Sequence, residues 1–403
     1  MDEDDLIRGI LDGSVKLHKV EEFTDSESHR AAEVRRRAME KLCRSELTHI
    51  SKYTINANEA MEKNIENMIG AVQMPLGVAG PLELNGEFAR GKYYVPLATT
   101  EGALVASVNR GCSALTASGG VTTTILKDGI SRAPALRVPS TRHAQVVANY
   151  VKENFEKIRA VAEHGEPYLK LLKITPYVVG RTLFLRFVYD TGDAMGMNMV
   201  TIGTDQALEL LEKEFPFLDY IALSGNMCVD KKPSALNFIE GRGKTVVSEA
   251  VIPPEIIEDK LKTSVDAIIE VNYRKNLLGS AQAGSYGFNA QVANVIAALY
   301  IATGQDEAHV VEGSHAITTC EKIEDKLHVA VTLPCVQVGT VGGGTIVETQ
   351  QECLKLLGVA GGGNNNSKAF AEVVAAAVLA GEVSLIGALA ARHLARAHKE
   401  HGR

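Results

Sequence analysis

Apolar and polar residues alternate at helical spacing in several long segments of the chain. The segment 26–50 (SESHRAAEVRRRAMEKLCRSELTHI) has this pattern near the N-terminus. Further helices are expected over 143–165, 205–215, 255–272, 289–303 and 367–397. The last of these contains two uncharged apolar runs, VVAAAVLAG and VSLIGALAA, which Glu382 separates. Neither run approaches the ~18 residues that a membrane span needs, so we predict one or two buried helices there.

Between residues 134 and 223 the pattern changes to short strands. ALRVPS, YLKLLKITPYVV and RTLFLRFVYD have the β-branched and aromatic content typical of strands. With the helices over 143–165 and 205–215, they form a compact α+β unit. A chain of 403 residues is long enough for two or three domains. We therefore predict a small domain over 134–223, inserted into a large domain of 51–133 and 224–403, and a helical segment over 1–50.

Composition and charge exclude several classes of function. The net charge of −7 argues against a protein of nucleic acids or anionic membranes, although a local basic pocket is compatible with it. The opening MDEDDLIRGI has no basic segment before an apolar core, so we expect no signal peptide and a cytoplasmic protein. Six cysteines lie far apart without a CxxC pair, which indicates free, mostly buried thiols. There is no HExxH, and hence no zinc signature.

The segment DKKPSALNFIEGRGKT, residues 230–245, ends like a phosphate-binding P-loop. A P-loop requires a glycine five residues before Gly243, and position 238 is phenylalanine. Pro233 also interrupts the preceding residues. A solvated basic turn and a catalytic lysine site both remain compatible with the segment.

Two further motifs are ambiguous when each is taken alone. GTVGGGT, residues 339–345, lacks the G-x-G-x-x-G spacing of a dinucleotide site, and its glycines favour either a sharp turn or a close approach to a ligand. DAMGMN, residues 193–198, follows a predicted strand and suits either core packing or contact with a flat ring.

In a third motif, TTEG, Thr99 and Thr100 are suitable caps for a helix that begins at Glu101. The segment 66–84 is broken by glycine and proline, which predicts loops and short strands rather than a long helix.

The motifs stand in a fixed order along the chain: ENMIGAVQMPLGVAGPL, TTEGALVAS, DAMGMN, SGNMCVDKKPSALNFIEGRGK, GTVGGGT and HLARAH. From about residue 40 onward the chain resembles the 3-hydroxy-3-methylglutaryl-coenzyme A (HMG-CoA) reductase family. DAMGMN, with Met197, is similar to the biosynthetic, NADPH-using class, because the degradative class typically has alanine there. Unlike the animal members, the chain is expected to have no membrane domain.

The resemblance implies a reaction and an architecture. Two NADPH would reduce (S)-HMG-CoA to mevalonate and free CoA, through bound hemithioacetal and aldehyde intermediates and without a metal. This reaction belongs to isoprenoid biosynthesis. The implied fold class is α+β: a large domain around a long central helix, with an inserted small ferredoxin-like cofactor domain. Active sites between subunits imply a homodimer or homotetramer.

Four residues match the family's catalytic positions. Lys231 matches the lysine whose ammonium stabilises the negative charge that hydride attack builds on the thioester oxygen. Glu101, in TTEG, matches the proton donor of the aldehyde step, and Asp306 matches the aspartate that couples to both. His398 matches the histidine that protonates the departing CoA thiolate.

Three of these residues also have a plainer interpretation. In the first turn of a helix, Glu101 would be a carboxylate that the macrodipole keeps ionised, which opposes the protonated form that it needs as an acid. Asp306 is compatible with a loop residue at the end of a helix. His398, like His393 and His401, is compatible with a surface histidine, and only the alignment of HLARAH selects it.

The resemblance also implies binding residues. The carboxylate of HMG needs a cationic pocket, and Arg132 matches the family's arginine at that position. The other implied HMG contacts are Ser224, Asn226, Asp230, Lys232, Lys275 and Asn294. The implied residues near CoA are Asn109, Arg110 and Lys262. The implied nicotinamide contacts are Asp193, Met195, Gly196, Met197, Asn198, Gly342, Gly343 and Gly344.

The chain departs from the family pattern in two places. Animal members place Ser-Arg near the 2′-phosphate of the cofactor, whereas Glu166-Pro167 stands here and the carboxylate would repel that phosphate. Lys170, Lys173 or Arg403 could compensate. The sequence also ends before the serine that is phosphorylated in animal members, so that switch is expected to be absent. An NADH-linked reductase and a catalytically silent CoA-binding protein remain the alternatives.

Overall fold

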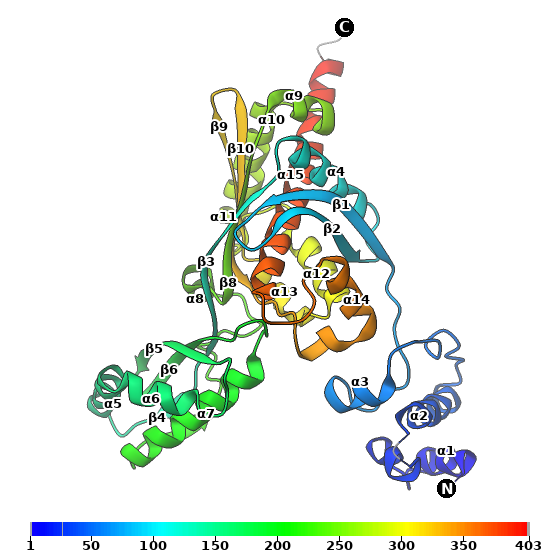
Figure 1. The fold of residues 1–403 in the computed structure, drawn as a ribbon, viewed down its shortest axis with the longest axis vertical. Coiled ribbons are helices and arrows are strands. Elements are labelled where there is room, and N and C mark those ends of the chain that lie inside the picture. Colours follow the sequence, from blue (N-terminus) through cyan, green and yellow to red (C-terminus); the bar gives the residue numbers. More distant parts are fainter. Residues whose placement is uncertain (1, 26, 401–403) are drawn as a thin grey trace.

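The computed structural model describes residues 2–25 and 27–400, with side chains described up to residue 392. Its first group of elements is helical and lies to one side of the molecule (Figure 1). Leu6, Ile7, Val20 and Val34 are among the residues of its own small hydrophobic core. The elements are α1 (Glu3–Asp12), η1 (Leu17–Phe23), α2 (Ser28–Cys43) and α3 (Ala57–Lys63). The helix expected within 26–50 is therefore present as α2.

The main body is built around α15 (Asn366–Glu400), which runs through it in Figure 1. α15 contacts α4, α10, α12 and β8. Over Asn366–Arg392 it is long and apolar enough to cross a membrane, but 83% of its most apolar window is buried inside the protein. Glu382 lies within this single helix, so the two apolar runs form one buried core helix.

The other elements of the main body surround α15. They begin with the hairpin β1 (Leu76–Asn85) and β2 (Arg90–Ala98) and with α4 (Leu104–Ala117). The central strands are β3 (Thr122–Arg132), β8 (Gly243–Ile252), β9 (Ile317–Ile323) and β10 (Lys326–Val336). The remaining elements are α8 (Ala235–Glu240), α9 (Pro254–Ile256), η2 (Ile257–Leu261), α10 (Val265–Val271), η3 (Asn272–Gly279), α11 (Ser280–Ala283), α12 (Val292–Thr303), η4 (Glu307–His309), α13 (Val310–Gly313), η5 (Gly343–Ile346) and α14 (Glu348–Leu356).

A second hydrophobic core lies away from α15, at the lower left of Figure 1. Leu136, Val147, Phe187 and Leu208 are among its buried residues. Its elements are β4 (Ala135–Arg137), α5 (Thr141–Glu153), α6 (Phe155–Ala162), β5 (Lys170–Val179), β6 (Thr182–Asp190), α7 (Met197–Glu214) and β7 (Asp219–Ala222). The assignment of 134–223 as an inserted ferredoxin-like domain stays a prediction.

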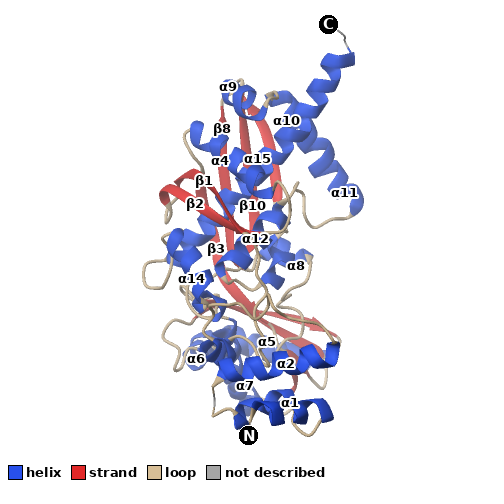
Figure 2. Cartoon of the chain, turned by 90° about the vertical axis from the view of Figure 1, so that its right-hand side faces the viewer, coloured by secondary structure: helices blue, strands red, loops and turns tan. Residues whose placement is uncertain are grey.

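One strand joins the two cores. β3 pairs with β8 over residues 122–129 and with β6 over 130–132, and both pairings are antiparallel. The sheet order is β7-β4-β6-β3-β8-β10-β9, with β5 paired to β6. The strands are drawn in red in Figure 2. The mixed helix-and-sheet class expected from the sequence is confirmed.

Several predicted boundaries were wrong. The expected helix 143–165 is divided by Asn154, which has non-helical backbone angles, into α5 and α6. The helix expected over 205–215 begins at Met197, because Gly196 takes the left-handed conformation just before it. The helix expected over 255–272 is interrupted at Lys262, which is also left-handed. The segment 66–84 leads into β1, a strand of ten residues that is longer than expected.

Candidate active site

The loop that carries Lys231 connects β7 to α8 and has an unusual backbone. Asn226, Val229 and Lys231 have φ values of 64°, 49° and 58°. Residues with a side chain rarely adopt this left-handed region, and a β-branched valine least of all. Such conformations persist only where the surrounding structure holds them, and they cluster at functional sites. GRGKT lies at the start of β8, with Lys244 and Thr245 buried in the strand, so the segment is not a P-loop.

Lys231 and Asp306 form an ion pair, with 2.8 Å between Lys231 Nζ and Asp306 Oδ2. The hydrogen bond to Asp306 raises the pKa of Lys231 above its usual range. Burial acts to raise the pKa of Asp306, but the hydrogen bond from Lys231 and nearby positive charge outweigh it, so the pKa lies below its usual range. Both groups are therefore ionised near neutral pH, and Lys231 is available as an ammonium.

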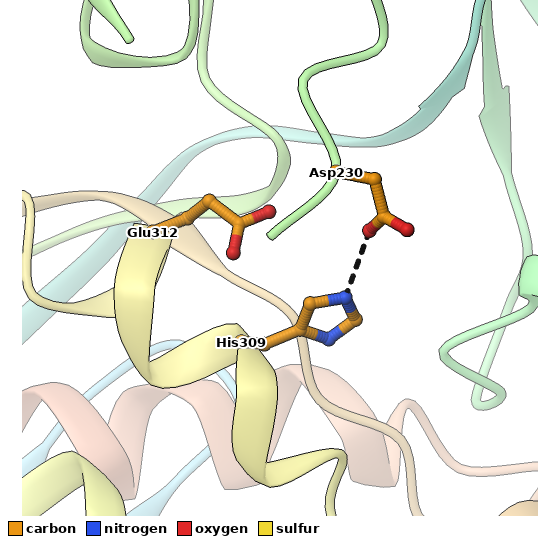
Figure 3. Close-up of side chains that lie close together, drawn as sticks. All are labelled: Asp230, His309 and Glu312. Carbon is orange, nitrogen blue, oxygen red and sulfur yellow. Dashed lines mark hydrogen bonds and ion pairs between the residues drawn. The ribbon is translucent and has the colours of Figure 1, made fainter. Parts of the chain in front are cut away.

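Asp230, Arg242, His309 and Glu312 form a cluster of polar and charged side chains, of which all but Asp230 are fully buried. Figure 3 shows His309 Nε2 and Asp230 Oδ1 in a hydrogen bond, 3.1 Å apart, with Glu312 beside them. Burial would raise the pKa of Asp230, but the hydrogen bond with His309 and the charge of Arg242 together lower it. Burial raises the pKa of Glu312.

Asp230, His309 and Glu312 are also a possible metal-binding set, since their ligand atoms lie within 4.8 Å of one another. Arg242 Nη1 lies 2.9 Å from Asp230 Oδ1 and 3.2 Å from Glu312 Oε1. The guanidinium thus occupies the side of both carboxylates that a cation would use. These residues fit an arginine-centred charge cluster better than a metal site.

Glu101 lies before α4 rather than inside it, which corrects the expected helix start. α4 begins at Leu104, and Thr99 Oγ1 accepts a hydrogen bond from the Glu101 amide in the preceding turn, at 2.9 Å. Glu101 thus lies two residues before the N-cap residue Ala103, outside the helix. Its carboxylate is exposed, and Asn294 Nδ2 donates to Glu101 Oε1 at 3.2 Å.

The Glu101–Asn294 pair and the Lys231–Asp306 pair lie near opposite ends of α12. From Asn294 to Thr303 the helix rises by about 14 Å, and Asp306 follows its C-terminal end. Among the described side chains, no hydrogen bond or ion pair joins Glu101 to Lys231 or Asp306. Within one chain, the expected proton donor, Glu101, therefore lies apart from the expected oxyanion lysine, Lys231.

Seven of the eight expected nicotinamide contacts, all except Asp193, line one cavity of about 600 Å³. Its lining includes residues 194–199, residues 339 and 341–345, and Asp306. A Cβ added at Gly342 or Gly343 would meet nothing within 4 Å, which places open space beside this backbone. A cavity lined by glycine backbone and by Met195 and Met197 fits a flat ring.

The Asp193 carboxylate is held by backbone amides. It accepts hydrogen bonds from the amides of Gly363 and Ser367, at 2.8 and 2.9 Å. Ser367 lies in the first turn of α15, where an acceptor satisfies free backbone N–H groups. The side chain therefore ties the loop between β6 and α7 to α15, and it is not among the residues that line the cavity.

The other expected substrate residues are spread over several elements. Arg132 donates to Thr201 Oγ1 on α7, at 2.7 Å from Nη2, and Ser224 Oγ lies 3.2 Å from Cys228 Sγ. Lys232 Nζ donates to the Asp230 carbonyl at 3.1 Å. Lys275 lines a cavity of about 730 Å³ that also contacts Pro233, next to the lysine loop.

The residues expected near CoA lie around α4 and its neighbours. Asn109 accepts from the Gly80 amide at 2.9 Å, and Arg110 Nη2 donates to the Ser384 carbonyl of α15 at 2.9 Å. Lys262 is exposed, and its Nζ lies 3.9 Å from Asp259 Oδ1. The side chain of His398 lies outside the described residues, although its backbone belongs to α15.

Comparison with known proteins decides the family. The sequence model described as hydroxymethylglutaryl-coenzyme A reductase matches residues 31–403. The chain belongs to this family. A 3-hydroxy-3-methylglutaryl-coenzyme A reductase of Pyrococcus abyssi is 56% identical over 412 residues, which cover 100% of both chains. That of Methanocaldococcus jannaschii is 53% identical over 404 residues, covering 99% of each.

More distant HMG-CoA reductases agree with this assignment. Reductase 2 of Arabidopsis thaliana is 44% identical, over 100% of this chain and 72% of its own length. A class II enzyme from Streptococcus pneumoniae, solved bound to NADPH in open conformations, shares the fold with a TM-score of 0.67. Its sequence is 18% identical, and the match covers 88% of this chain and 86% of that one. The chain is thus an oxidoreductase of the HMG-CoA reductase family, which reduces HMG-CoA to mevalonate.

The sequence interpretation missed three residues of the site. Arg242 stood out only as part of the GRGK segment, and His309 and Glu312 carried no motif. All three side chains are fully buried. The sequence did contain a signal for Arg242. An arginine between two glycines, just before an apolar strand, has no obvious role in solvent, which indicates a buried side chain. For His309 and Glu312, the only hint was their spacing of three and six residues from Asp306. Helical spacing would place them on the same face as Asp306, toward the loop that carries Lys231.

Proposed function

We propose that the chain reduces (S)-HMG-CoA with two NADPH for each CoA released, as a step of isoprenoid biosynthesis. The ionised Lys231–Asp306 pair beside the glycine-lined cavity carries this proposal. The nicotinamide, when bound, supplies hydride. Lys231 stabilises the negative charge on the substrate oxygen, and Asp306 keeps the ammonium charged and aimed.

The remaining steps need a proton donor and an acid for the leaving group. Glu101 donates the proton in the aldehyde step, held by Asn294. His398 protonates the departing thiolate. Arg132 and Lys275 contribute positive charge for the HMG carboxylate, and Arg110 and Lys262 contribute it for the anionic CoA. These roles follow the family motifs.

The separation of the two residue pairs supports a shared active site. Because α12 keeps Glu101 and Lys231 apart within one chain, a second copy would have to supply one of the two pairs. We therefore propose a homodimer, or a tetramer of two dimers, with active sites between subunits.

A second candidate is an NADH-linked reductase, and Glu166 favours it. Glu166 lies in the turn between α6 and β5, where its amide donates to the Glu163 carbonyl. Among the basic residues that could offset its charge, Lys173 is near Glu240, with 3.7 Å between Nζ and Oε2. Arg403 lies outside the described residues. The DAMGMN motif, with Met197, is similar to the NADPH-using class of the family and therefore still favours NADPH as the cofactor.

The deciding test adds HMG-CoA to purified protein with NADPH or with NADH and follows cofactor absorbance and CoA release. Two NADPH oxidised per CoA would establish the proposed reaction. A preference for NADH would retain the reductase and make Glu166 the residue to exchange for arginine. Oxidation of neither cofactor by a folded oligomer that binds CoA would favour the silent binding protein.

A further inference from the structure

The feature that goes beyond the family motifs is the way the charged cluster holds the backbone of Lys231. Glu312 Oε1 accepts a hydrogen bond from the Lys231 amide at 2.8 Å, and the same oxygen accepts from Arg242 Nη1 at 3.2 Å. The Glu312 and Arg242 side chains are both 0% exposed. An acceptor so deeply buried is fixed in place, because moving it would break a charge-assisted hydrogen bond in a low-dielectric interior.

This contact coincides with the strained turn of the loop. Lys231 has a φ of 58°, a conformation that a lysine rarely adopts without support. The turn directs its side chain to Asp306, while its amide points in to Glu312. The position of the ammonium therefore depends on a hydrogen bond at the other end of the same residue.

Arg242 extends the connection to the cofactor cavity. Its Nη2 lies 3.0 Å from Met197 Sδ, and its Nε donates to Ser131 Oγ at 3.2 Å. Met197 lines the 600 Å³ cavity, and Ser131 Oγ in turn donates to the carbonyl of Cys228 in the lysine loop, at 3.0 Å. The Arg242 guanidinium thus contacts Glu312 and Ser131, which bind the lysine loop. It also contacts Met197, which lines the cofactor cavity.

We propose that Glu312 and Arg242 are positioning residues for the reduction: Glu312 holds Lys231 in its left-handed turn, and Arg242 fixes Glu312 relative to Met197. The inference rests on the proposed function only for the catalytic role of Lys231. Neither residue contacts the substrate oxygen, so both act through Lys231. Losing them should lower kcat and leave the KM values nearly unchanged, because the binding pockets keep their own side chains.

The test compares Glu312→Gln with Glu312→Ala. Glutamine retains a carbonyl that can accept from the Lys231 amide, whereas alanine removes the acceptor. We expect Glu312→Ala to lower kcat by about 10- to 100-fold, the cost of misplacing a catalytic group by about 1 Å. We expect Glu312→Gln to recover most of that loss. Glu312→Leu, which fills the space without an acceptor, replaces the alanine variant if that protein does not fold.

A second measurement does not depend on activity. A brief pulse of acetic anhydride, read by mass spectrometry, reports how much of each lysine is free amine, with Lys232 as the internal reference. Release of Lys231 from Asp306 should raise its relative labelling by about tenfold for each unit by which its pKa falls. The increase is expected for alanine or leucine at position 312 and not for glutamine.

Glu372→Gln is the matched control. Glu372 is also 0% exposed and accepts from the amides of Glu87, Phe88 and Ala89, far along the chain from Lys231. It should lower stability without changing the labelling of Lys231. Equal labelling in the wild type and in Glu312→Ala, or equal effects of Gln and Ala at 312, would overturn the proposal. So would a matching change in Glu372→Gln. If the labelling follows the expected pattern in a protein that oxidises neither cofactor, the proposed function fails and the positioning role stands.

Discussion

Two lysine–aspartate pairs in this protein have the same length and different surroundings. Lys231 Nζ lies 2.8 Å from Asp306 Oδ2, and Lys322 Nζ lies 2.8 Å from Asp266 Oδ1. The lysine side chains are also almost equally exposed, at 42% and 43%. Neither the distance nor the exposure of the lysine distinguishes the two pairs.

Their surroundings do distinguish them. Asp266 is 76% exposed and its pair joins α10 to β9 on the surface, whereas Asp306 is 31% exposed and lines a cavity. Lys231 has a left-handed backbone above buried Glu312 and Arg242. Exposed ion pairs contribute little to stability. The Lys231–Asp306 pair is therefore distinguished by the buried side chains that hold its backbone and by the cavity that it lines.

The largest contrast is expected between Lys231→Ala and Lys322→Ala. Removing the Lys231 ammonium should lower kcat by about 10³-fold or more with HMG-CoA and with free mevaldehyde, because both reductions build charge on an oxygen. Lys322→Ala should retain nearly wild-type rates. Initial rates of NADPH oxidation on both substrates decide the matter. A Lys231→Ala enzyme that kept a large part of its activity on either substrate would remove the distinction.

The two aspartates should differ next. Asp306→Asn retains the shape of the side chain and an acceptor for the Ala308 amide, which Asp306 Oδ1 binds at 3.1 Å. It removes the charge that keeps Lys231 ionised and aimed, so kcat should fall by about 100-fold. Asp266→Asn should have no effect on the same assay. Loss of activity in both variants would point to a general electrostatic effect rather than a local one.

A smaller effect is expected when the cavity beside Lys231 is changed and the ion pair is kept. A Cβ on Gly344 would lie 2.6 Å from the Gly304 carbonyl oxygen, so the glycine wall must move. Gly344→Ala should raise the KM for the nicotinamide cofactor by about tenfold, equivalent to ~1.4 kcal/mol of binding, with a smaller change in kcat. Steady-state kinetics at varied NADPH measure this. A fall in kcat with an unchanged KM would mean that the glycine wall serves the lysine rather than the cofactor.

The sequence predicted the parts of the site that depend on chemistry carried by motifs. Residues of GTVGGGT and of DAMGMN line one cavity, and Asp306, which pairs with Lys231 of DKK, lines it as well. The long core helix was also visible in the sequence, because a long apolar segment with a single internal glutamate is typical of a buried helix in a globular chain. In the structure, Glu382 is satisfied by the amides of Ala290 and Gln291 and by Thr318.

The parts that could not be predicted depend on contacts between distant segments. Glu312 lies 81 positions from the lysine whose amide it binds, and no local pattern encodes that distance. The start of α4 was misplaced because Ala103 adopts a left-handed φ of 69°, which moves the helix start beyond Glu101. Alanine gives no warning of such a conformation, since the preference for it is imposed by the fold rather than by the residue.

The smallest expected effect concerns the stability of the Lys231–Asp306 pair. Since the folded pKa of Asp306 is lowered, its contribution is present above the unfolded value near pH 4 and is lost as pH falls through the folded value. Since the pKa of Lys231 is raised, its contribution is present at and below about pH 10 and is lost only as pH rises through the folded value. Both side chains are partly exposed, so the pair should contribute no more than about 1 kcal/mol at neutral pH.

Urea unfolding of the wild type and of Asp306→Asn should therefore show a small difference at neutral pH that disappears in acid. The Asp266→Asn protein should show a smaller difference, because that pair is more exposed to solvent. If the difference at Asp306 persisted in acid, it would come from packing or from the cap on Ala308 rather than from the ion pair. The two pairs would then be electrostatically equivalent in the resting protein, and their contrast would lie wholly in catalysis.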